Sequence, residues 1–471
     1  MDAIDLVETH ISRVFLVGDE VFKVKKPVDL GFLDFTTLED REHFCREEVR
    51  LNRRTAPDVY KGAVPIRRGG EVVEWAVWMR RLPGDATLQA RLRDGRLTEP
   101  DLFEVARVVA DFHARAEGGP AIAQAGAFEA VARLCRENFT QTSEPHNPPW
   151  VRARDATEAA LVRLAPLIQA RAERGVPRDT HGDLRLDHVY LLPEGVTIID
   201  CVEFSPALRC ADPVADVAFL VMELRAEGRP DLARAFTDAW FSRRGDEEGR
   251  ALLDLYVAYR SAVRAKVRSI EAAQEGIPEA QRAAALRRAR GHWLLALATL
   301  EPPRRRPALV VLCGLPGTGK TTLARHMAAE HGFEIASTDL VRAAQGPSDY
   351  SEGGKDATYA RTLAAAAAAL DLGQRVAIDA GLWDQTWRQR FLAEARDRMI
   401  PHLLIVCEAD RHEVKRRLAQ RTGDASEADW SVYEAAERRW VAPTSALTIQ
   451  TDAADAGHAA LAGALGEAGL A

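Results

Sequence analysis

One short loop constrains the fold of this chain more than any other feature. Its residues satisfy the pattern G-x-x-x-x-G-K-[ST] and read Gly314-Leu315-Pro316-Gly317-Thr318-Gly319-Lys320-Thr321. An apolar, strand-like run over Ala308–Cys313 precedes the loop, and a helical pattern over Lys320–His331 follows it. Glycines let the backbone curl so that its N–H groups point at an anion, and the start of the following helix adds positive potential. The loop therefore predicts a phosphate site between a buried strand and a helix.

The side chains of this segment fit the phosphates of ATP with magnesium. Lys320 is expected to reach the β- and γ-phosphates, and the Thr321 hydroxyl to hold Mg²⁺. Asp379 ends an apolar strand over residues 376–378, where a carboxylate can bind the metal directly or through water. A helix-capping or turn aspartate is the alternative for Asp379. The residues expected to bind the nucleotide are Gly314, Leu315, Pro316, Gly317, Thr318, Gly319, Lys320, Thr321 and Thr322.

A second pair of side chains follows the next predicted strand, Glu334–Ser337. Asp339 and Arg342 are three residues apart, so a helix would place them on one face. The aspartate can accept a proton from an attacking hydroxyl while the arginine holds a phosphate. From the spacing alone, a capping aspartate beside a surface arginine is an equally good interpretation.

The order of predicted elements divides the chain into two domains. Residues 301–307 carry prolines on both sides of an arginine run and read as an exposed linker. Beyond it, strands at 334–337, 375–378 and 402–407 alternate with helices, which predicts an α/β fold with a parallel sheet covered by helices. We therefore expect domains at 1–300 and 308–471, joined by the linker 301–307.

Over about residues 308–450 the chain resembles the P-loop small-molecule kinases. That group includes gluconate kinases, chloramphenicol phosphotransferase, zeta toxins and the kinase part of polynucleotide kinases. The resemblance implies phosphate transfer from ATP to a hydroxyl, with the acceptor received by Asp339 and Arg342. It also implies an arginine-bearing lid over residues 416–421, in which Arg417 and Arg421 reach the transferred phosphate; a solvated basic helix is the alternative. Residues 307–471 are more acidic than basic, which favours a small hydroxylated acceptor over a polynucleotide.

The N-terminal half carries a second group of motif residues. The segment His181-Gly182-Asp183-Leu184-Arg185-Leu186-Asp187-His188 parallels the kinase catalytic loop H-x-D-x-x-x-x-N. In that loop the Asp accepts the substrate proton and the Asn holds magnesium. Asp200 follows at the distance expected of the second metal ligand. Upstream, Lys23 or Lys25 lies on a predicted hairpin strand and Glu48 on the next predicted helix, as the phosphate-holding lysine and its partner would.

Together these residues resemble the aminoglycoside phosphotransferase family over about residues 8–300. The resemblance implies an α+β, protein-kinase-like fold that binds ATP and Mg²⁺, with Asp183 as base and Asp200 and His188 at the metal positions. His188 stands where the family pattern has Asn, and imidazole is a poor ligand for a hard cation. An active kinase and a nucleotide-binding scaffold therefore both stay open. The order of the two domains resembles a bacterial group of fused kinases.

Composition excludes several classes of protein. The formal net charge is −7, which argues against a broad nucleic-acid surface. No apolar run reaches the roughly 18 residues of a membrane span, the N-terminus lacks a signal-peptide pattern, and six scattered cysteines favour reduced thiols. We expect a cytoplasmic ATP-dependent kinase that acts on a small molecule through residues 308–471. The alternatives are chemistry at Asp183 and Asp200, or a nucleotide-dependent switch.

Overall fold

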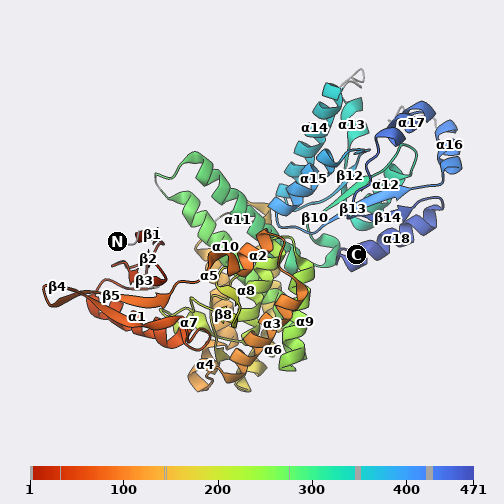
Figure 1. Ribbon diagram of the computed structural model, residues 1–471. Helices are drawn as coiled ribbons and strands as arrows, with labels where there is room; N and C mark the ends of the chain where they lie inside the picture. Colours follow the sequence, from red (N-terminus) through yellow and green to blue (C-terminus); the bar gives the residue numbers. More distant parts are fainter. Residues whose placement is uncertain are drawn as a thin grey trace. The chain divides into compact units, whose positions relative to one another are not determined.

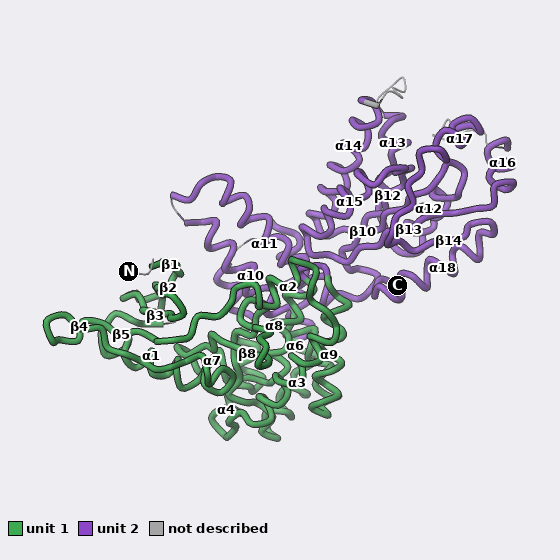
Figure 2. The backbone as a smooth tube through the Cα atoms, viewed as in Figure 1, with its two compact units in different colours: residues 1–134, 161–225, 229–257 green, residues 135–160, 226–228, 258–471 purple. Residues whose placement is uncertain are grey.

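The chain forms two compact units. The computed structural model describes residues 4–31, 33–142, 144, 146–274, 276–344, 352–420 and 428–471. Residues 1–134, 161–225 and 229–257 belong to the first unit, and residues 135–160, 226–228 and 258–471 belong to the second (Figure 2). The boundaries of these units do not fall at residues 301–307. The expected division into functional domains at 1–300 and 308–471 therefore stays a prediction.

The first unit begins with a five-stranded antiparallel sheet in the order β1-β2-β3-β5-β4 (Figure 1). The predicted hairpin is present as β2 and β3, which turn at Gly18, whose φ is 56°. Helix α1 (Leu38–Asn52) buries Cys45 and Val49 in one core with Val77 and Met79 of the sheet. The strands are β1 (Ile4–Glu8), β2 (Ser12–Val17), β3 (Glu20–Lys25), β4 (Tyr60–Arg68) and β5 (Glu71–Arg80).

The chain then becomes mainly helical, with two small antiparallel strand pairs: β6 (Arg178–Asp179) with β9 (Cys210–Ala211), and β7 (Val189–Leu192) with β8 (Gly195–Ile198). The helices of this part are α2 (Leu88–Arg93), α3 (Glu99–Arg115), α4 (Pro120–Ala125), α5 (Phe128–Thr140), α6 (Pro148–Glu173), α7 (Pro206–Arg209), α8 (Pro213–Ala226), α9 (Pro230–Arg244), α10 (Leu253–Ala273) and α11 (Glu279–Leu300). Short 3₁₀ turns lie at Gly84–Ala86 and Glu247–Leu252.

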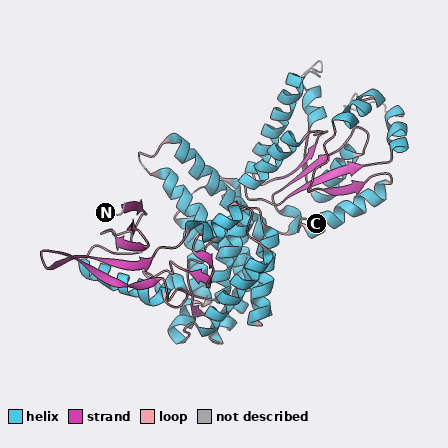
Figure 3. Cartoon of the chain, in the orientation of Figure 1, coloured by secondary structure: helices cyan, strands magenta, loops and turns pink. Residues whose placement is uncertain are grey.

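The second unit contains a five-stranded parallel sheet in the order β11-β12-β10-β13-β14 (Figure 3). Every residue of β10 is buried, as expected of a strand covered on both faces. One face packs in a core with residues of α14 and α15, and the other with residues of α12 and α18. The parallel sheet covered by helices is therefore confirmed.

The elements of this sheet alternate along the sequence. The strands are β10 (Ala308–Cys313), β11 (Glu334–Ser337), β12 (Arg375–Asp379), β13 (His402–Glu408) and β14 (Leu447–Gln450). The helices are α12 (Lys320–His331), α13 (Thr338–Ala343), α14 (Glu352–Asp371), α15 (Gln385–Asp397), α16 (Arg411–Ala419), α17 (Trp430–Arg439) and α18 (Ala454–Glu467).

The register of the sheet fixes where the predicted site residues meet. Asp379 at the end of β12 pairs with Leu312 of β10 on one side and with Ser337 of β11 on the other. The strands are parallel, so the chain leaves all three of them at the same edge. The loop after β10, the Asp379 carboxylate and the start of α13 therefore lie together at the carboxyl edge of the sheet.

The predicted linker is held by contacts within the second unit. Pro303–Arg305 form a 3₁₀ turn. Glu301 is 5% exposed and pairs with Arg152 at 2.6 Å, and Arg306 donates to the Gly469 carbonyl at 3.1 Å. The proline–arginine segment is thus tied down at both ends rather than simply solvated.

The cysteines and the possibility of a membrane-spanning helix can be examined in the described residues. All six cysteines are buried and unpaired with one another. None of the described helices has both the length and the apolar character needed to cross a bilayer.

Candidate functional site

The loop after β10 has a backbone that only glycine permits at its first position. Gly314 has a φ of 143°, and a Cβ there would lie 2.5 Å from the carbonyl oxygen of Cys407. Its N–H donates to the Gly381 carbonyl at 3.2 Å, which ties the loop to the chain beyond β12. Gly319, with a φ of 85°, ends the loop where α12 begins. The loop therefore curls between strand and helix as the sequence predicts.

Lys320 and Thr321 place their polar ends at this loop. The Lys320 ammonium donates to the carbonyls of Gly314 at 3.0 Å and Leu315 at 2.7 Å. The Thr321 hydroxyl donates to Asp379 Oδ2 at 2.8 Å. Burial raises the pKa of Asp379 and lowers the pKa of Lys320, because both charges are removed from water. A bound phosphate and a cation would relieve both of these desolvation penalties.

The expected magnesium ligands thus meet in space. A hydroxyl and a carboxylate oxygen are hard oxygen donors of the kind Mg²⁺ prefers, alongside phosphate oxygens and water. The capping interpretation of Asp379 is not supported, since Asp384 is the residue that caps α15, accepting from the Thr386 N–H at 2.8 Å. The donor set at Thr321 and Asp379 therefore fits the cation.

The predicted acceptor pair forms on α13. Arg342 donates to Asp339 Oδ1 at 2.8 Å, and the two side chains are 18% and 30% exposed. Ser337 occupies the N-cap position of α13, so Asp339 is not the capping residue. A solvent-accessible carboxylate and guanidinium therefore stand beside each other at the edge where the phosphate loop opens.

Sequence reasoning missed the loop over residues 380–384, which borders this edge. Leu382 has a φ of 48°, a strained backbone for a side chain of this size, and its N–H donates to the Tyr359 hydroxyl at 3.3 Å. Trp383 lies under the ammonium of Lys355, 5.6 Å from the ring centre. No motif marks these residues, although strain of this kind is found at functional sites.

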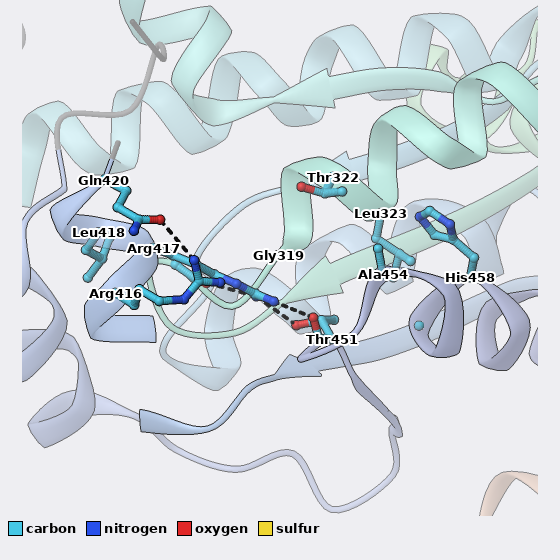
Figure 4. A pocket seen from close by; sticks show the side chains of 12 residues that line it. Gly319, Thr322, Leu323, Arg416, Arg417, Leu418, Gln420, Thr451, Ala454 and His458 are labelled. Carbon is cyan, nitrogen blue, oxygen red and sulfur yellow. Dashed lines mark hydrogen bonds between the residues drawn. The ribbon is translucent and has the colours of Figure 1, made fainter. Parts of the chain in front are cut away.

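A cavity of about 510 Å³ lies between the phosphate loop, helix α16 and the start of α18 (Figure 4). Arg417 lies in its wall, where it donates to the Thr451 carbonyl at 2.6 Å and to Glu413 at 2.7 Å. Its predicted contact with transferred phosphate stays a prediction, and Arg421 lies outside the described residues. The lining residues are Gly317, Gly319, Thr322, Leu323, Arg416, Arg417, Leu418, Gln420, Thr451, Ala454, Gly457 and His458.

The first unit brings its predicted lysine and carboxylates together. Lys23 Nζ lies 2.9 Å from Glu48 Oε1 and 2.6 Å from Asp200 Oδ1. Lys25 also pairs with Glu48, at 2.8 Å, but its second partner is the buried Glu203. Lys23, rather than Lys25, therefore faces Asp200. Burial alone would raise the pKa of Asp200, but the nearby Lys23 and His188 outweigh it and lower that pKa.

Asp216 of α8 anchors the predicted catalytic loop, a role that was not predicted from the sequence. Its carboxylate accepts from the N–H groups of His181 at 3.0 Å and Gly182 at 2.9 Å, and contacts His113 Nε2 at 3.0 Å. Burial opposes ionisation of Asp216, yet these donors lower its pKa to about 2. The side chain of Asp183 is 28% exposed, so the expected base is accessible.

His188 lies among the carboxylates of this loop. Its Nδ1 is 2.9 Å from the Asp183 carbonyl oxygen. Its Nε2 is 3.5 Å from Asp200 Oδ2 and 3.7 Å from Asp187 Oδ1. Within the described residues, no three His, Cys, Asp or Glu side chains form a ready metal-binding group. Any cation here would need ligands from outside the protein as well.

A family model matches the part of the chain that contains the phosphate loop. The family described as AAA domain matches residues 309–443. A gluconokinase structure from Sinorhizobium meliloti 1021 is 14% identical, covering 35% of this chain and 96% of its own, with a TM-score of 0.28. A choline/ethanolamine kinase family protein from Mesorhizobium loti is 13% identical, covering 63% and 92%, with a TM-score of 0.37. At these TM-scores neither resemblance bears on function.

Curated relatives match nearly the whole length of the chain. One of them is the uncharacterized protein Rv2004c of Mycobacterium tuberculosis H37Rv, which is 34% identical over 457 residues. The match covers 93% of this chain and 90% of the relative. The chain therefore belongs to the same protein family as Rv2004c.

Proposed function

We propose that the second unit is an ATP-dependent kinase that transfers the γ-phosphate to a hydroxyl of a small molecule. One observation carries this proposal: the strand register puts the phosphate loop, Asp379 and the Asp339–Arg342 pair at one edge of the sheet. A phosphate donor and an acceptor hydroxyl must meet at such a place.

Each of these residues has a task that its position supports. The loop N–H groups and Lys320 bind and orient the β- and γ-phosphates. Thr321 and Asp379 would hold Mg²⁺, which neutralises charge on the phosphates when bound. Asp339 accepts the proton of the attacking hydroxyl, and Arg342 orients that carboxylate and stabilises negative charge on the transferred group.

The charge of residues 307–471 supports a small acceptor. These residues are more acidic than basic, which disfavours binding of a polyanion. A 5′-hydroxyl polynucleotide is therefore the less favoured acceptor.

The test is transfer of label from γ-labelled ATP to a metabolite extract, with Asp339→Asn and Asp183→Asn run beside the unaltered protein. A labelled product lost only in Asp339→Asn supports the proposal. Loss only in Asp183→Asn moves the chemistry to the first unit. ATP hydrolysis without any labelled product favours a nucleotide-dependent switch.

A second candidate site is favoured by the Lys23–Glu48 pair, 2.9 Å apart. In protein kinases a strand lysine paired with a helix glutamate holds ATP phosphates. With Asp183 accessible and its loop anchored by Asp216, the first unit is a candidate nucleotide site. In a Lys320→Ala protein, in which binding by the second unit is weakened, Lys23→Met should then reduce the ATP binding that remains. In a chain with Lys320 intact, Lys23→Met should leave binding by the second unit unchanged.

A further inference from the structure

His188 is almost fully enclosed by protein. It is 9% exposed, and its ring lies between the carboxylates of the predicted catalytic loop and the Asp200 carboxylate at the end of the next hairpin. In the kinase pattern an asparagine side chain at this position would offer an amide oxygen. Here the chain offers a ring nitrogen instead, and that changes which cation the site can accept.

The hydrogen bonding of the ring fixes which nitrogen carries the proton. A carbonyl oxygen can only accept, so the contact of 2.9 Å between Nδ1 and the Asp183 carbonyl requires a proton on Nδ1. In the neutral ring the lone pair is then on Nε2. Histidines that bind metals usually donate their other N–H to a backbone carbonyl or carboxylate in this way.

The Nε2 lone pair faces carboxylate oxygens rather than a donor. Asp200 Oδ2 is 3.5 Å away and Asp187 Oδ1 is 3.7 Å away. Among the described residues Asp187 Oδ1 is buried and accepts no hydrogen bond. A lone pair and carboxylate oxygens at these separations repel one another unless a proton or a cation lies between them.

The 3.5 Å between His188 Nε2 and Asp200 Oδ2 suits two ligands of a single metal ion, and the 3.7 Å to Asp187 Oδ1 is slightly too long. Ligands about 2.1 Å from one ion stand about 3.0–3.6 Å apart for angles between a right angle and a trigonal one. The other oxygen of Asp200 stays on Lys23, 2.6 Å away. The protein therefore supplies one nitrogen and one or two oxygens, and phosphate oxygens or water would complete the shell.

We propose that His188 and Asp200 form a cation site in the first unit, with Asp187 beside them, that prefers a first-row transition-metal dication to magnesium. A mixed nitrogen and oxygen set suits Mn²⁺, Co²⁺ or Zn²⁺, whereas Mg²⁺ prefers oxygen throughout. The proposal concerns the first unit and does not depend on which unit transfers phosphate.

The experiment uses Mn²⁺ as a paramagnetic probe, with a non-hydrolysable ATP analogue, on the full chain. All samples carry Lys320→Ala and Thr321→Ala, which weaken the second unit's own cation site. Pulsed EPR then reports whether a nitrogen ligand couples to the bound Mn²⁺. His188→Asn restores the kinase-pattern oxygen ligand, and His10→Asn makes the same change at an exposed position of the same unit.

We expect nitrogen coupling in the background protein and in His10→Asn, and none in His188→Asn. Affinity for Mn²⁺ should fall at least about tenfold in His188→Asn, while Mg²⁺ should displace Mn²⁺ more easily there. Asp200→Asn should lose the bound Mn²⁺ as well, and thermal unfolding of each variant checks that the fold persists.

Either of two results would overturn the proposal. Absence of bound Mn²⁺ in the background protein would mean that His188 and Asp200 do not form a cation site. Bound Mn²⁺ without nitrogen coupling, unchanged in His188→Asn, would mean that oxygen ligands alone hold it. Neither result touches the proposal for the second unit, whose cation site lacks Thr321 in these samples.

Discussion

The bond between the Thr321 hydroxyl and Asp379 connects the phosphate loop to the neighbouring strand at 2.8 Å. Replacing Thr321 by Val keeps the shape of the side chain and removes the hydroxyl. Because the hydroxyl is also a proposed ligand of Mg²⁺, we expect binding of MgATP to weaken about 10- to 100-fold. Calorimetric titration measures this change. Thr386→Val, the same change at an exposed position of α15, should leave the affinity as it is; an equal loss there would contradict the assignment.

A substitution at Gly314 tests whether the backbone of the phosphate loop requires glycine. Gly314→Ala would bring a Cβ within 2.5 Å of the Cys407 carbonyl oxygen at a φ of 143°. We expect a loss of about 2 kcal/mol or more in the free energy of unfolding, together with loss of ATP binding. Gly463→Ala is the matched control, because Gly463 lies within α18 and a Cβ there meets nothing within 4 Å. That change should stabilise the protein by about 0.5–1 kcal/mol, as denaturant unfolding would show.

Stability at mildly acid pH depends on the buried His292 of the second unit. Burial first, and then Arg264, Arg268 and Arg288, lower its pKa from 6.5 to about 3. Between those values the unfolded chain binds the proton and the folded chain does not, so stability falls as pH decreases below 6.5. From pH 6.5 to 5 this contributes a loss of about 2 kcal/mol. His292→Gln should flatten this part of the stability–pH curve, and an unchanged slope would contradict the assignment.

At the scale of elements, local sequence signals predicted helices and strands well. Contacts between residues far apart in the sequence could not be predicted from such signals. Helix α12 and strand β11 have the predicted bounds, because the glycine loop and the apolar run mark them directly. Helix α14 begins at Glu352, although the sequence disfavours a helix at Gly353 and Gly354.

The candidate site shows the same division. The loop, Asp339, Arg342 and Asp379 could be predicted, because each follows a strand that the sequence marks. Thr451 could not, since it contacts the Thr318 carbonyl from 133 positions further along the chain, at 2.8 Å, and no motif accompanies it. The anchoring role of Asp216 could not be predicted either, because it comes from the backbone N–H groups of a distant loop.

Helix α16 is fastened to the core of the second unit by one of its arginines. Arg417 donates to the Thr451 carbonyl at 2.6 Å, whereas Arg416 bonds to Glu413 and Gln420 at the helix itself. We expect Arg417→Ala to speed amide hydrogen exchange across Arg411–Ala419, because the link to the end of β14 is lost. Arg416→Ala should change exchange there much less. Equal effects of both changes would mean that the helix is held by other contacts.

At the scale of the whole molecule, each unit has its own sheet and its own buried core. Ligands that bind one unit should therefore stabilise that unit first. A ligand at 100 times its dissociation constant adds about 2.7 kcal/mol to the state that binds it.

MgATP should accordingly raise the unfolding temperature of the second unit and have little effect on the first. The second unit has the ligand set that fits magnesium, Thr321 with Asp379, whereas the first has an imidazole, His188, beside Asp200. Hydrogen exchange during a thermal ramp follows β10 and β3 separately and so reports each unit within the full chain. In Lys320→Ala the protection of β10 by MgATP should fall by most of its value, because the ammonium no longer reaches the phosphates. Equal protection of β3 and β10 in the unaltered protein would show that the units unfold together, and protection of β3 alone would move the main MgATP site to the first unit.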